Sequence, residues 1–344
     1  MKRHFRKILG TAILSLMALT ACGNEEAAEA QIGSTTEDNS KEVITIKVGH
    51  ISPPEHSFAI GFDQFAAAVE EETDGQVQFE IYGGGQLGGE RDLTEQVQLG
   101  TLDMTLVTTG PVANFVPMLG VLDMPFLFES LDHVYATLDG EVGADLLAEM
   151  TSVGLKGFAF WENGMRHFSN NKQEIRTPDD IKGLKMRTLE NDIFVETYRA
   201  LGTDPTPIAF PEVYTSFQQG VVDGSDFSVG VFESTKQYEV QSHFSQSGIY
   251  YAAAVLMMNG EKFNSLPTEV QEVFVSLGEE YAGIQRQITQ DMEEEQIIKM
   301  KDQGVQVIEA SEIDVAAFKK AVQPVYDQHA DRFGDYIERI QANQ

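Results

Sequence analysis

The sequence predicts an α/β fold of two lobes, each a mostly parallel sheet flanked by helices. Short runs with apolar residues at alternate positions are followed by segments with apolar residues at helical spacing, and a second series of such runs begins near residue 155. One long helical pattern after Pro267 predicts a helix that spans both lobes. With 42% hydrophobic residues, the chain can fill two cores.

The first series predicts a βαβαβ unit, which is typical of a sheet with parallel strands. Alternating apolar residues predict strands at 44–48, 77–81 and 104–107. Helical spacing predicts a helix that starts at Ser57 and stops near Gly75, and another over 90–99 that stops at Gly100. A ligand is expected in the crevice at the carboxyl ends of such strands.

The second series contains predicted strands at 155–161 and 253–257. Thr177 is expected to be an N-cap with Pro178 at the first helical position. The long helix should bury one apolar face, formed by Val270, Phe274, Leu277, Tyr281, Ile284 and Ile288. Arg286 lies off this face and is expected to be exposed.

Residues 1–21 have the composition of a signal peptide, with a basic start and a short apolar run. The tetrapeptide LTAC that ends at Cys22 resembles a bacterial lipobox, which predicts lipidation of Cys22 and cleavage before it. The alternative is an ordinary cleaved signal beside an incidental cysteine. Cys22 is the only cysteine in the sequence, so no internal disulfide is expected. Residues 22–42 are predicted to form an acidic, flexible tether.

The chain is strongly acidic, with 54 Asp and Glu against 24 Lys and Arg. Loss of the signal peptide, with its four basic residues, changes the formal charge from -30 to -34. This charge argues against nucleic acids and anionic membrane surfaces as partners through general electrostatics. A site for an anion must therefore use few arginines, sheltered from the surface acids.

Residues 83–88 match the G-x-G-x-x-G pattern, follow a predicted strand and precede a helix. A dinucleotide site is disfavoured, because the pattern follows the second strand and Glu90 would place negative charge where a pyrophosphate should lie. The glycines more simply allow the loop to bend into the crevice. Two roles stay open for Glu90, that of a helix cap and that of an acceptor for a ligand hydroxyl or amine.

No residue pattern predicts an enzyme or a cofactor. The seven histidines show no metal-ligand spacing, and neither a G-x-S-x-G motif nor a P-loop occurs. By contrast, Arg187 ends a short apolar strand, where its planar guanidinium could hold a carboxylate through two hydrogen bonds. The alternative for Arg187 is a surface residue or the partner in a structural ion pair.

Several motifs together resemble the solute-binding proteins of TRAP transporters (tripartite ATP-independent periplasmic transporters), the DctP-like family. They are GLKMR at 183–187, PTPIAF at 205–210, GVVDGSD at 220–226, and the segments 86–91, 99–104, 125–128, 164–166, 238–241 and 257–259. The matches keep the same order over about 43–330, nearly the whole mature chain. The resemblance implies a periplasmic-binding-protein-like fold with lobe I at 43–163 and 253–292 and lobe II at 164–252 and 293–344.

In this family the arginine that corresponds to Arg187 pairs with the ligand carboxylate, and Arg166 corresponds to a second contact. Phe210 matches an aromatic residue that packs on the ligand, and Trp161 is close enough in sequence to Arg166 to line the pocket. Relatives commonly carry an asparagine at the position of Phe227, and Asp226 and Phe227 are the candidate ligand-binding residues of this segment. Phe227 cannot donate a hydrogen bond, which favours a monocarboxylate or a ligand with an apolar or ring part over a polyhydroxylated acid.

The resemblance implies a lipid-anchored extracytoplasmic protein that delivers a small organic acid to a sodium-coupled permease. Some relatives use a metal ion, but nothing in this sequence requires one. Two alternatives come from other classes: a ligand-sensing lipoprotein that works with a receptor, and an exported enzyme. The identity of the acid, the affinity and the oligomeric state do not follow from the sequence.

Overall fold

A nine-stranded sheet runs through the computed structural model, which describes residues 42–343. The signal peptide, Cys22 and nearly all of the tether lie outside the described residues. The strands are β1 (Ile44–Gly49), β2 (Val77–Tyr82), β3 (Met104–Thr108), β4 (Leu155–Asn170), β5 (Lys185–Thr188), β6 (Asp204–Pro207), β7 (Gly224–Phe227), β8 (His243–Asn259) and β9 (Gln306–Ile308). Their order is β2-β1-β3-β8-β4-β7-β5-β6, and β9 pairs with β8.

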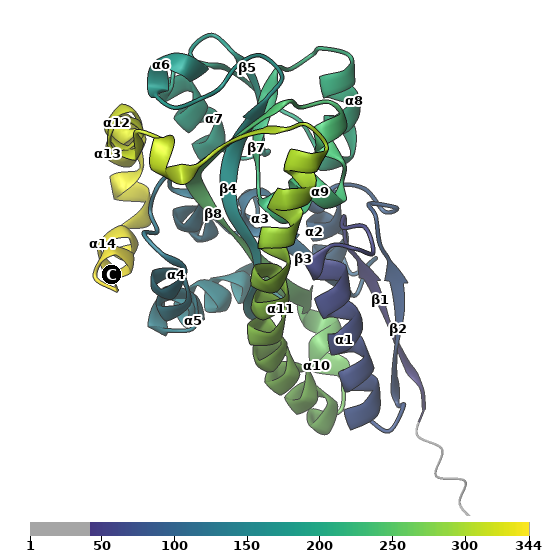
Figure 1. The fold of residues 1–344 in the computed structure, drawn as a ribbon. Helices are drawn as coiled ribbons and strands as arrows, with labels where there is room; N and C mark the ends of the chain where they lie inside the picture. Colours follow the sequence, from purple (N-terminus) through teal and green to yellow (C-terminus); the bar gives the residue numbers. More distant parts are fainter. Residues whose placement is uncertain (1–41, 344) are drawn as a thin grey trace, which may run out of the picture. The chain divides into compact units, whose positions relative to one another are not determined.

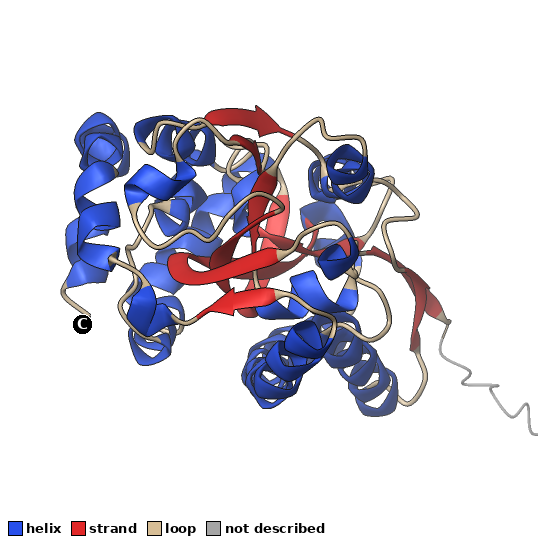
Figure 2. Cartoon of the chain, turned by 45° about the horizontal axis from the view of Figure 1, so that its top comes forward, coloured by secondary structure: helices blue, strands red, loops and turns tan. Residues whose placement is uncertain are grey.

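Helices cover the sheet on both faces (Figures 1 and 2). They are α1 (Ser57–Glu72), α2 (Glu90–Gln98), α3 (Thr109–Val112), α4 (Leu131–Leu138), α5 (Glu141–Glu149), α6 (Pro178–Ile181), α7 (Asp192–Ala200), α8 (Phe210–Gln218), α9 (Val229–Ser234), α10 (Gly260–Ser265), α11 (Thr268–Asp302), α12 (Val315–Ala321), α13 (Gln323–Phe333) and α14 (Tyr336–Gln341), with short 3₁₀ turns that include η1 (Pro117–Asp123). The α/β class is confirmed, as are Thr177 and Pro178 at the N-terminus of α6.

The sheet is parallel at its two ends and antiparallel in the middle. Strands β2, β1 and β3 pair in parallel, as do β6, β5 and β7. Between them, β4 and β8 run antiparallel to each other and to their neighbours β7 and β3. These two strands have 16 and 17 residues, much longer than the predicted strands, and join the two parallel groups into one sheet.

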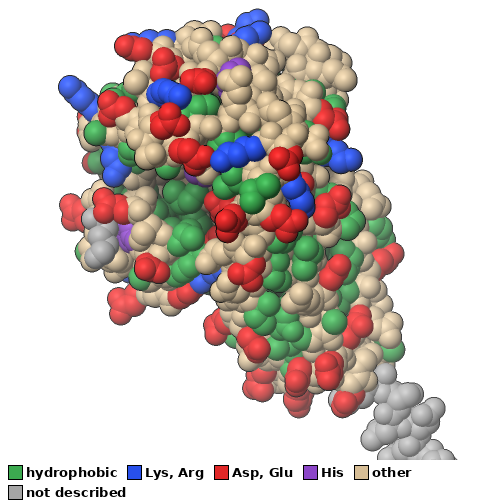
Figure 3. All heavy atoms as spheres, viewed as in Figure 1, with side chains coloured by type: hydrophobic (Ala, Val, Ile, Leu, Met, Phe, Trp, Pro, Cys, Tyr) green, Lys and Arg blue, Asp and Glu red, His purple; other side chains and the backbone are tan. Residues whose placement is uncertain are grey.

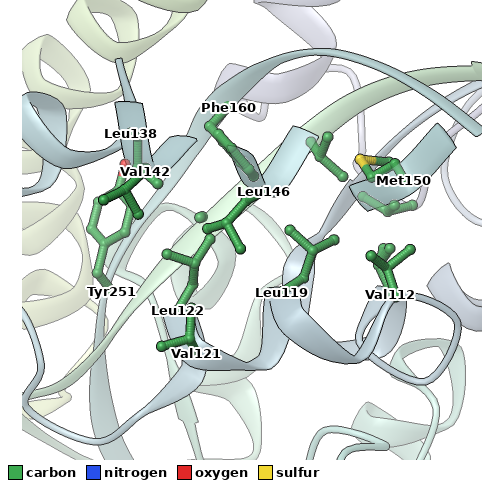
Figure 4. Packing of buried hydrophobic residues seen from close by; sticks show 14 of the residues in the cluster. Val112, Leu119, Val121, Leu122, Leu138, Val142, Leu146, Met150, Phe160 and Tyr251 are labelled. Carbon is green, nitrogen blue, oxygen red and sulfur yellow. The ribbon is translucent and has the colours of Figure 1, made fainter. Parts of the chain in front are cut away.

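Four hydrophobic clusters fill the space between the sheet and the helices. The largest packs side chains of η1, α4 and α5 against the strands, with Leu122, Leu146 and Phe160 at its centre (Figure 4). Val121, Leu122 and Leu146 are fully buried, so this part of the core is closely packed and rigid. Within residues 42–343, no helix is both long and apolar enough to cross a membrane.

The long helix is confirmed as α11, which lies along α1 and continues to α9 (Figure 1). Its first turns bury Val270 and Phe274, but further along it buries polar side chains. The expectation that Arg286 is exposed is wrong, because its exposed fraction is 6%. Its guanidinium donates to both carboxylate oxygens of Asp139, at 2.6 and 2.8 Å, and to the carbonyl of Phe160 at 2.8 Å.

Candidate ligand-binding site

Arg187 lies on β5 and has an exposed fraction of 4%. Its Nε donates to the carbonyl oxygen of Ile208 at 3.0 Å, and this is the only hydrogen bond that its side chain makes within residues 42–343. Burial, with a smaller contribution from Arg166, lowers its pKa to about 10. The guanidinium is therefore charged at neutral pH, fixed at Nε, and free to donate from both Nη atoms.

Arg166 on β4 is held by Asp226 on the neighbouring strand β7. Its Nε donates to Oδ2 of Asp226 and its Nη2 donates to the backbone oxygen of the same residue at 2.5 Å. The other carboxylate oxygen, Oδ1, accepts from the hydroxyl of Tyr198 at 2.7 Å. All three side chains are buried, so the charge of Arg166 is already balanced inside the protein.

Glu90 is the first residue of α2, yet it does not cap this helix. The capping carboxylate belongs to Asp92, which accepts from the Gly89 backbone N–H at 2.9 Å. Glu90 instead accepts from Thr108 at the end of β3, from its backbone N–H at 2.7 Å and its hydroxyl at 2.9 Å. Burial raises the pKa of Glu90, while the bonds from Thr108 and the charges of Arg166 and Arg187 act in the opposite direction.

These contacts bring together four of the residues predicted from the sequence. Arg187 interacts electrostatically with Arg166, Asp226 and Glu90, so the four charged groups share one buried site. Tyr198 and Thr108 complete it, and no sequence signal pointed to either of them. They enter the site only because α7 packs against β5, and because β3 pairs with β8, the neighbour of β4.

The glycine-rich loop at 83–89 packs beside the segment that follows Ile208. A Cβ atom added at Gly89 would lie 3.5 Å from that of Ala209, and one at Gly85 would lie 3.7 Å from Cγ of Pro211. Both Gly84 and Gly85 have positive φ angles, 66° and 73°, which other residues rarely adopt. The loop can therefore approach the end of β6 closely, next to the carbonyl that holds Arg187.

The three aromatic residues predicted to contact the ligand differ in how deeply they are buried. Trp161 is fully buried between α1 and α11, where its Nε1 donates to the carbonyl of Gly278 at 3.4 Å. Phe227 is fully buried against Phe217, on the face of β7 opposite to Asp226. Phe210 starts α8, two residues after Ile208, and is half-buried. Of the three, Phe210 directly follows the segment that holds Arg187 and is the one whose side chain is not fully buried.

The described residues offer no evident metal site. Among residues 42–343, no three His, Cys, Asp or Glu side chains gather in a way that could hold a metal ion. The site instead consists of two buried arginines, two buried carboxylates and surrounding hydroxyl groups. Such an arrangement is chemically suited to a small polar molecule that carries negative charge.

Comparisons with known proteins agree with a solute-binding class. The family model described as "Bacterial extracellular solute-binding protein, family 7", DctP, matches residues 48–332. A solute-binding protein of Verminephrobacter eiseniae is 38% identical over 286 residues, which cover 83% of this chain and 85% of that protein. The chain therefore belongs to the DctP family of TRAP transporter solute-binding proteins.

Two solved structures of TRAP periplasmic solute-binding proteins share the fold. The protein from Polaromonas sp. JS666, bound to D-erythronate, has a TM-score of 0.85 and 39% identity, and the match covers 87% of this chain and 98% of that one. The protein from Sulfitobacter sp. NAS-14.1, bound to β-D-galacturonate, has a TM-score of 0.83 and 31% identity, with coverage of 87% and 98%. The periplasmic-binding fold expected from the sequence is thereby confirmed.

Proposed function

We propose that this protein captures a small organic acid anion through an ion pair between Arg187 and a carboxylate of the ligand. The observation that carries this proposal is a buried guanidinium whose two Nη atoms make no hydrogen bond within residues 42–343. Both Nη atoms still reach solvent in this largely buried site, so an incoming anion can complete the donors that the protein leaves unused. A carboxylate matches the two Nη donors geometrically, and its attraction to them is stronger in a buried site than in water.

The balance of charges supports a ligand with one carboxylate. Asp226 neutralises Arg166, so Arg187 is the cation left to meet an external anion. Glu90 would repel a second carboxylate but can accept a hydrogen bond from a ligand hydroxyl. Phe227 gives no support to an apolar ligand, because its ring lies in the core. D-erythronate and β-D-galacturonate, bound by the two similar structures, each carry one carboxylate and several hydroxyls.

We further propose that the acid is delivered to a sodium-coupled permease and that no reaction is catalysed, as the family implies. Lobe I (43–163 and 253–292) and lobe II (164–252 and 293–344) would close on the ligand around the long strands β4 and β8. The lipobox-like sequence at Cys22 would anchor the mature protein to the membrane, on the outer side. The tether at 22–42 would then keep the binding unit away from the lipid surface.

A thermal-shift screen with D-erythronate, D-galacturonate and succinate tests this function. A ligand that binds only the folded protein raises its melting temperature, and the stabilisation is about 2.7 kcal/mol at a hundred times Kd. We expect the monocarboxylates to stabilise the parent more than succinate does, and Arg187→Ala to remove the effect. The proposal fails if none of a broad set of organic acids shifts the parent.

A further inference from the structure

A short polar connection joins the segment that carries Arg187 to the segment that follows Thr108. Its centre is Asn191, four residues after Arg187, with an exposed fraction of 4%. The Asn191 amide donates to the carbonyl of Gly110 at 3.0 Å and to Oδ2 of Asp123 at 2.9 Å. Its oxygen accepts from the backbone N–H of Ile193 at 2.8 Å and so caps α7. Because both amide protons and the oxygen are used, the orientation of Asn191 is defined.

Asp123, at the end of η1, has an exposed fraction of 2%. Its other oxygen, Oδ1, lies 3.3 Å from the hydroxyl of Thr109, and that hydroxyl lies 3.2 Å from the carbonyl of Ala253. A hydroxyl carries one proton and a carbonyl can only accept. If Thr109 donates to the nearer Ala253, its contact with Asp123 is a hydrogen bond only when the Asp123 carboxyl carries a proton.

The charges around Asp123 also favour its neutral form. The two nearby arginines are engaged elsewhere: Arg166 pairs with Asp226, and Arg332 pairs with Asp192 at 2.8 Å. Asp192, on α7, repels a negative charge at Asp123. Burial is the largest effect and raises the pKa of Asp123 to about 8. The two arginines act in the opposite direction, as does the Thr109 hydroxyl where it donates its proton to the ionised carboxylate. A buried carboxyl without a cation of its own is expected to take up a proton.

We propose that Asp123, as a neutral carboxylic acid, is a positioning residue of the binding site. It donates its proton to Thr109 and accepts from Asn191, and so holds the Arg187 segment against residues 108–110. Thr108, which binds the Glu90 carboxylate, directly precedes Thr109. Hydrogen bonds on either side of the Thr108–Thr109 peptide bond thereby link Glu90 to the segment that carries Arg187. The effect on ligand binding rests on the function proposed above, whereas the protonation of Asp123 does not.

The sign of the pH effect follows from the raised pKa. In the unfolded chain Asp123 loses its proton near pH 4, and in the folded protein only near pH 8. Between these values the folded state binds the additional proton, so the folded state loses stability as the pH rises. If ligand release exposes Asp123 to water, the complex also dissociates faster as the pH approaches 8.

The first experiment needs no ligand and compares the parent with Asp123→Asn by urea unfolding at pH 6.5, 7.5 and 8.5. The amide has the shape of the neutral acid, with a donor for Thr109 and an acceptor for Asn191, but it does not titrate. Below pH 8, the unfolding equilibrium constant of the parent should increase with pH more steeply than that of the variant. The difference should be up to about a factor of ten per pH unit. Asp132→Asn, at an exposed acid of α4, serves as the matched control and should keep the slope of the parent. If the unfolding constants of the parent and Asp123→Asn depend on pH equally, the proposal that Asp123 is protonated is refuted.

The second experiment tests positioning with Asp123→Leu, which keeps the size of the side chain but forms no hydrogen bond. Hydrogen exchange over 188–194 at pH 7 should be at least about tenfold faster than in the parent, and Asp123→Asn should restore protection. With D-erythronate as the probe, Asp123→Leu should speed dissociation by a similar factor while Asp123→Asn stays close to the parent. If Asp123→Leu folds and its hydrogen exchange over 188–194 equals that of the parent, the positioning role is refuted. If Asp123→Leu does not fold, the exchange rate of the parent over 188–194 decides. After correction for intrinsic exchange, this rate must increase from pH 7 to 8.5 more than the rate of Asp123→Asn does. If no organic acid binds the parent, the proposed function fails. The pH dependence of unfolding still decides whether Asp123 is protonated, and the hydrogen exchange rates still decide whether it positions the Arg187 segment.

Discussion

The Nε atom of Arg187 donates to the carbonyl oxygen of Ile208 at 3.0 Å, and this bond orients the guanidinium while leaving both Nη atoms for a ligand. Ile208 precedes α8, so the same bond ties the strand β5 to the start of that helix. The arginine is thus preorganised, which reduces the entropy lost when an anion binds.

Arg187→Ala should weaken the binding of an organic acid by at least tenfold. Truncation of one partner of a buried charge pair costs about 2 to 5 kcal/mol, and about 1.4 kcal/mol already corresponds to a factor of ten. Arg187→Lys should recover only part of the affinity, because it keeps the charge but loses the planar fork. Isothermal titration calorimetry measures both effects.

Arg199→Ala is the matched control for this experiment. Arg199 is exposed near the end of α7 and should contribute little to ligand affinity. A folded Arg187→Ala protein that binds the acid like the parent would show that the anion is held elsewhere. Arg286 is unsuitable as the control, because it is buried and paired with Asp139.

Asp226→Asn should destabilise the protein and change its preference among ligands. The substitution leaves Arg166 buried without its counter-ion, and breaking a buried ion pair costs about 3 to 5 kcal/mol. The released charge of Arg166 should also raise the affinity for succinate relative to D-erythronate. Urea unfolding and competition binding measure the two effects, and an unchanged ratio of affinities would argue against charge balance as the basis of selectivity.

His56 should make the protein less stable in acid. Its Nδ1 accepts from the Phe58 backbone N–H at 3.1 Å and caps α1, and burial lowers its pKa to about 4. The unfolded chain binds a proton near pH 6.5 and the folded protein does not, so stability is lost as the pH falls from 6.5 towards 4. The loss is at most about 1.4 kcal/mol per pH unit from this residue.

His56→Asn tests this dependence, since asparagine is also a good N-cap and does not titrate in this range. Urea unfolding at pH 7, 6 and 5 should show a shallower loss of stability in the variant than in the parent. His167, whose pKa is also lowered to about 4 by burial, remains in both proteins and contributes equally. Parallel curves would mean that the proton uptake of unfolding occurs at other groups.

Arg286→Met should lower stability without changing ligand affinity. The substitution removes the bidentate bond to Asp139, the bond to the Phe160 carbonyl and the stacking on Tyr135, whose ring centre lies 4.6 Å from the guanidinium carbon. Asp139 is largely exposed and can be solvated, so we expect a cost of about 1 to 3 kcal/mol. Thermal unfolding checks the cost, and a stability equal to that of the parent would contradict it.

Cys22→Ala should release the protein from membranes or leave it as uncleaved precursor. Lipidation requires the thiol, and a lipid-modified Cys22 is the anchor proposed for the mature chain. Fractionation of cells that express the parent and the variant measures the distribution. Normal cleavage together with full membrane retention of the variant would exclude this anchor.

The sequence by itself determined the local elements and the first candidate for anion binding, Arg187. Alternating apolar residues located β1, β2 and β3, and helical spacing located α1, α2 and α11. These patterns act over neighbouring residues, so they can be recognised without knowledge of the fold. Arg187 was identified in the same way, because its strand, its neighbours and the family motif are contiguous.

Only the tertiary structure decided which distant residues meet. Arg166 pairs with Asp226 because β4 lies beside β7, whereas Trp161, five residues earlier on the same strand, is buried against α1 and α11. Phe227 enters the core because adjacent residues on a strand point to opposite faces. The burial of Arg286 and the chain of contacts through Asp123 likewise depend on elements far apart in sequence. Such contacts follow from strand pairing and from the desolvation of charges, which local sequence patterns do not encode.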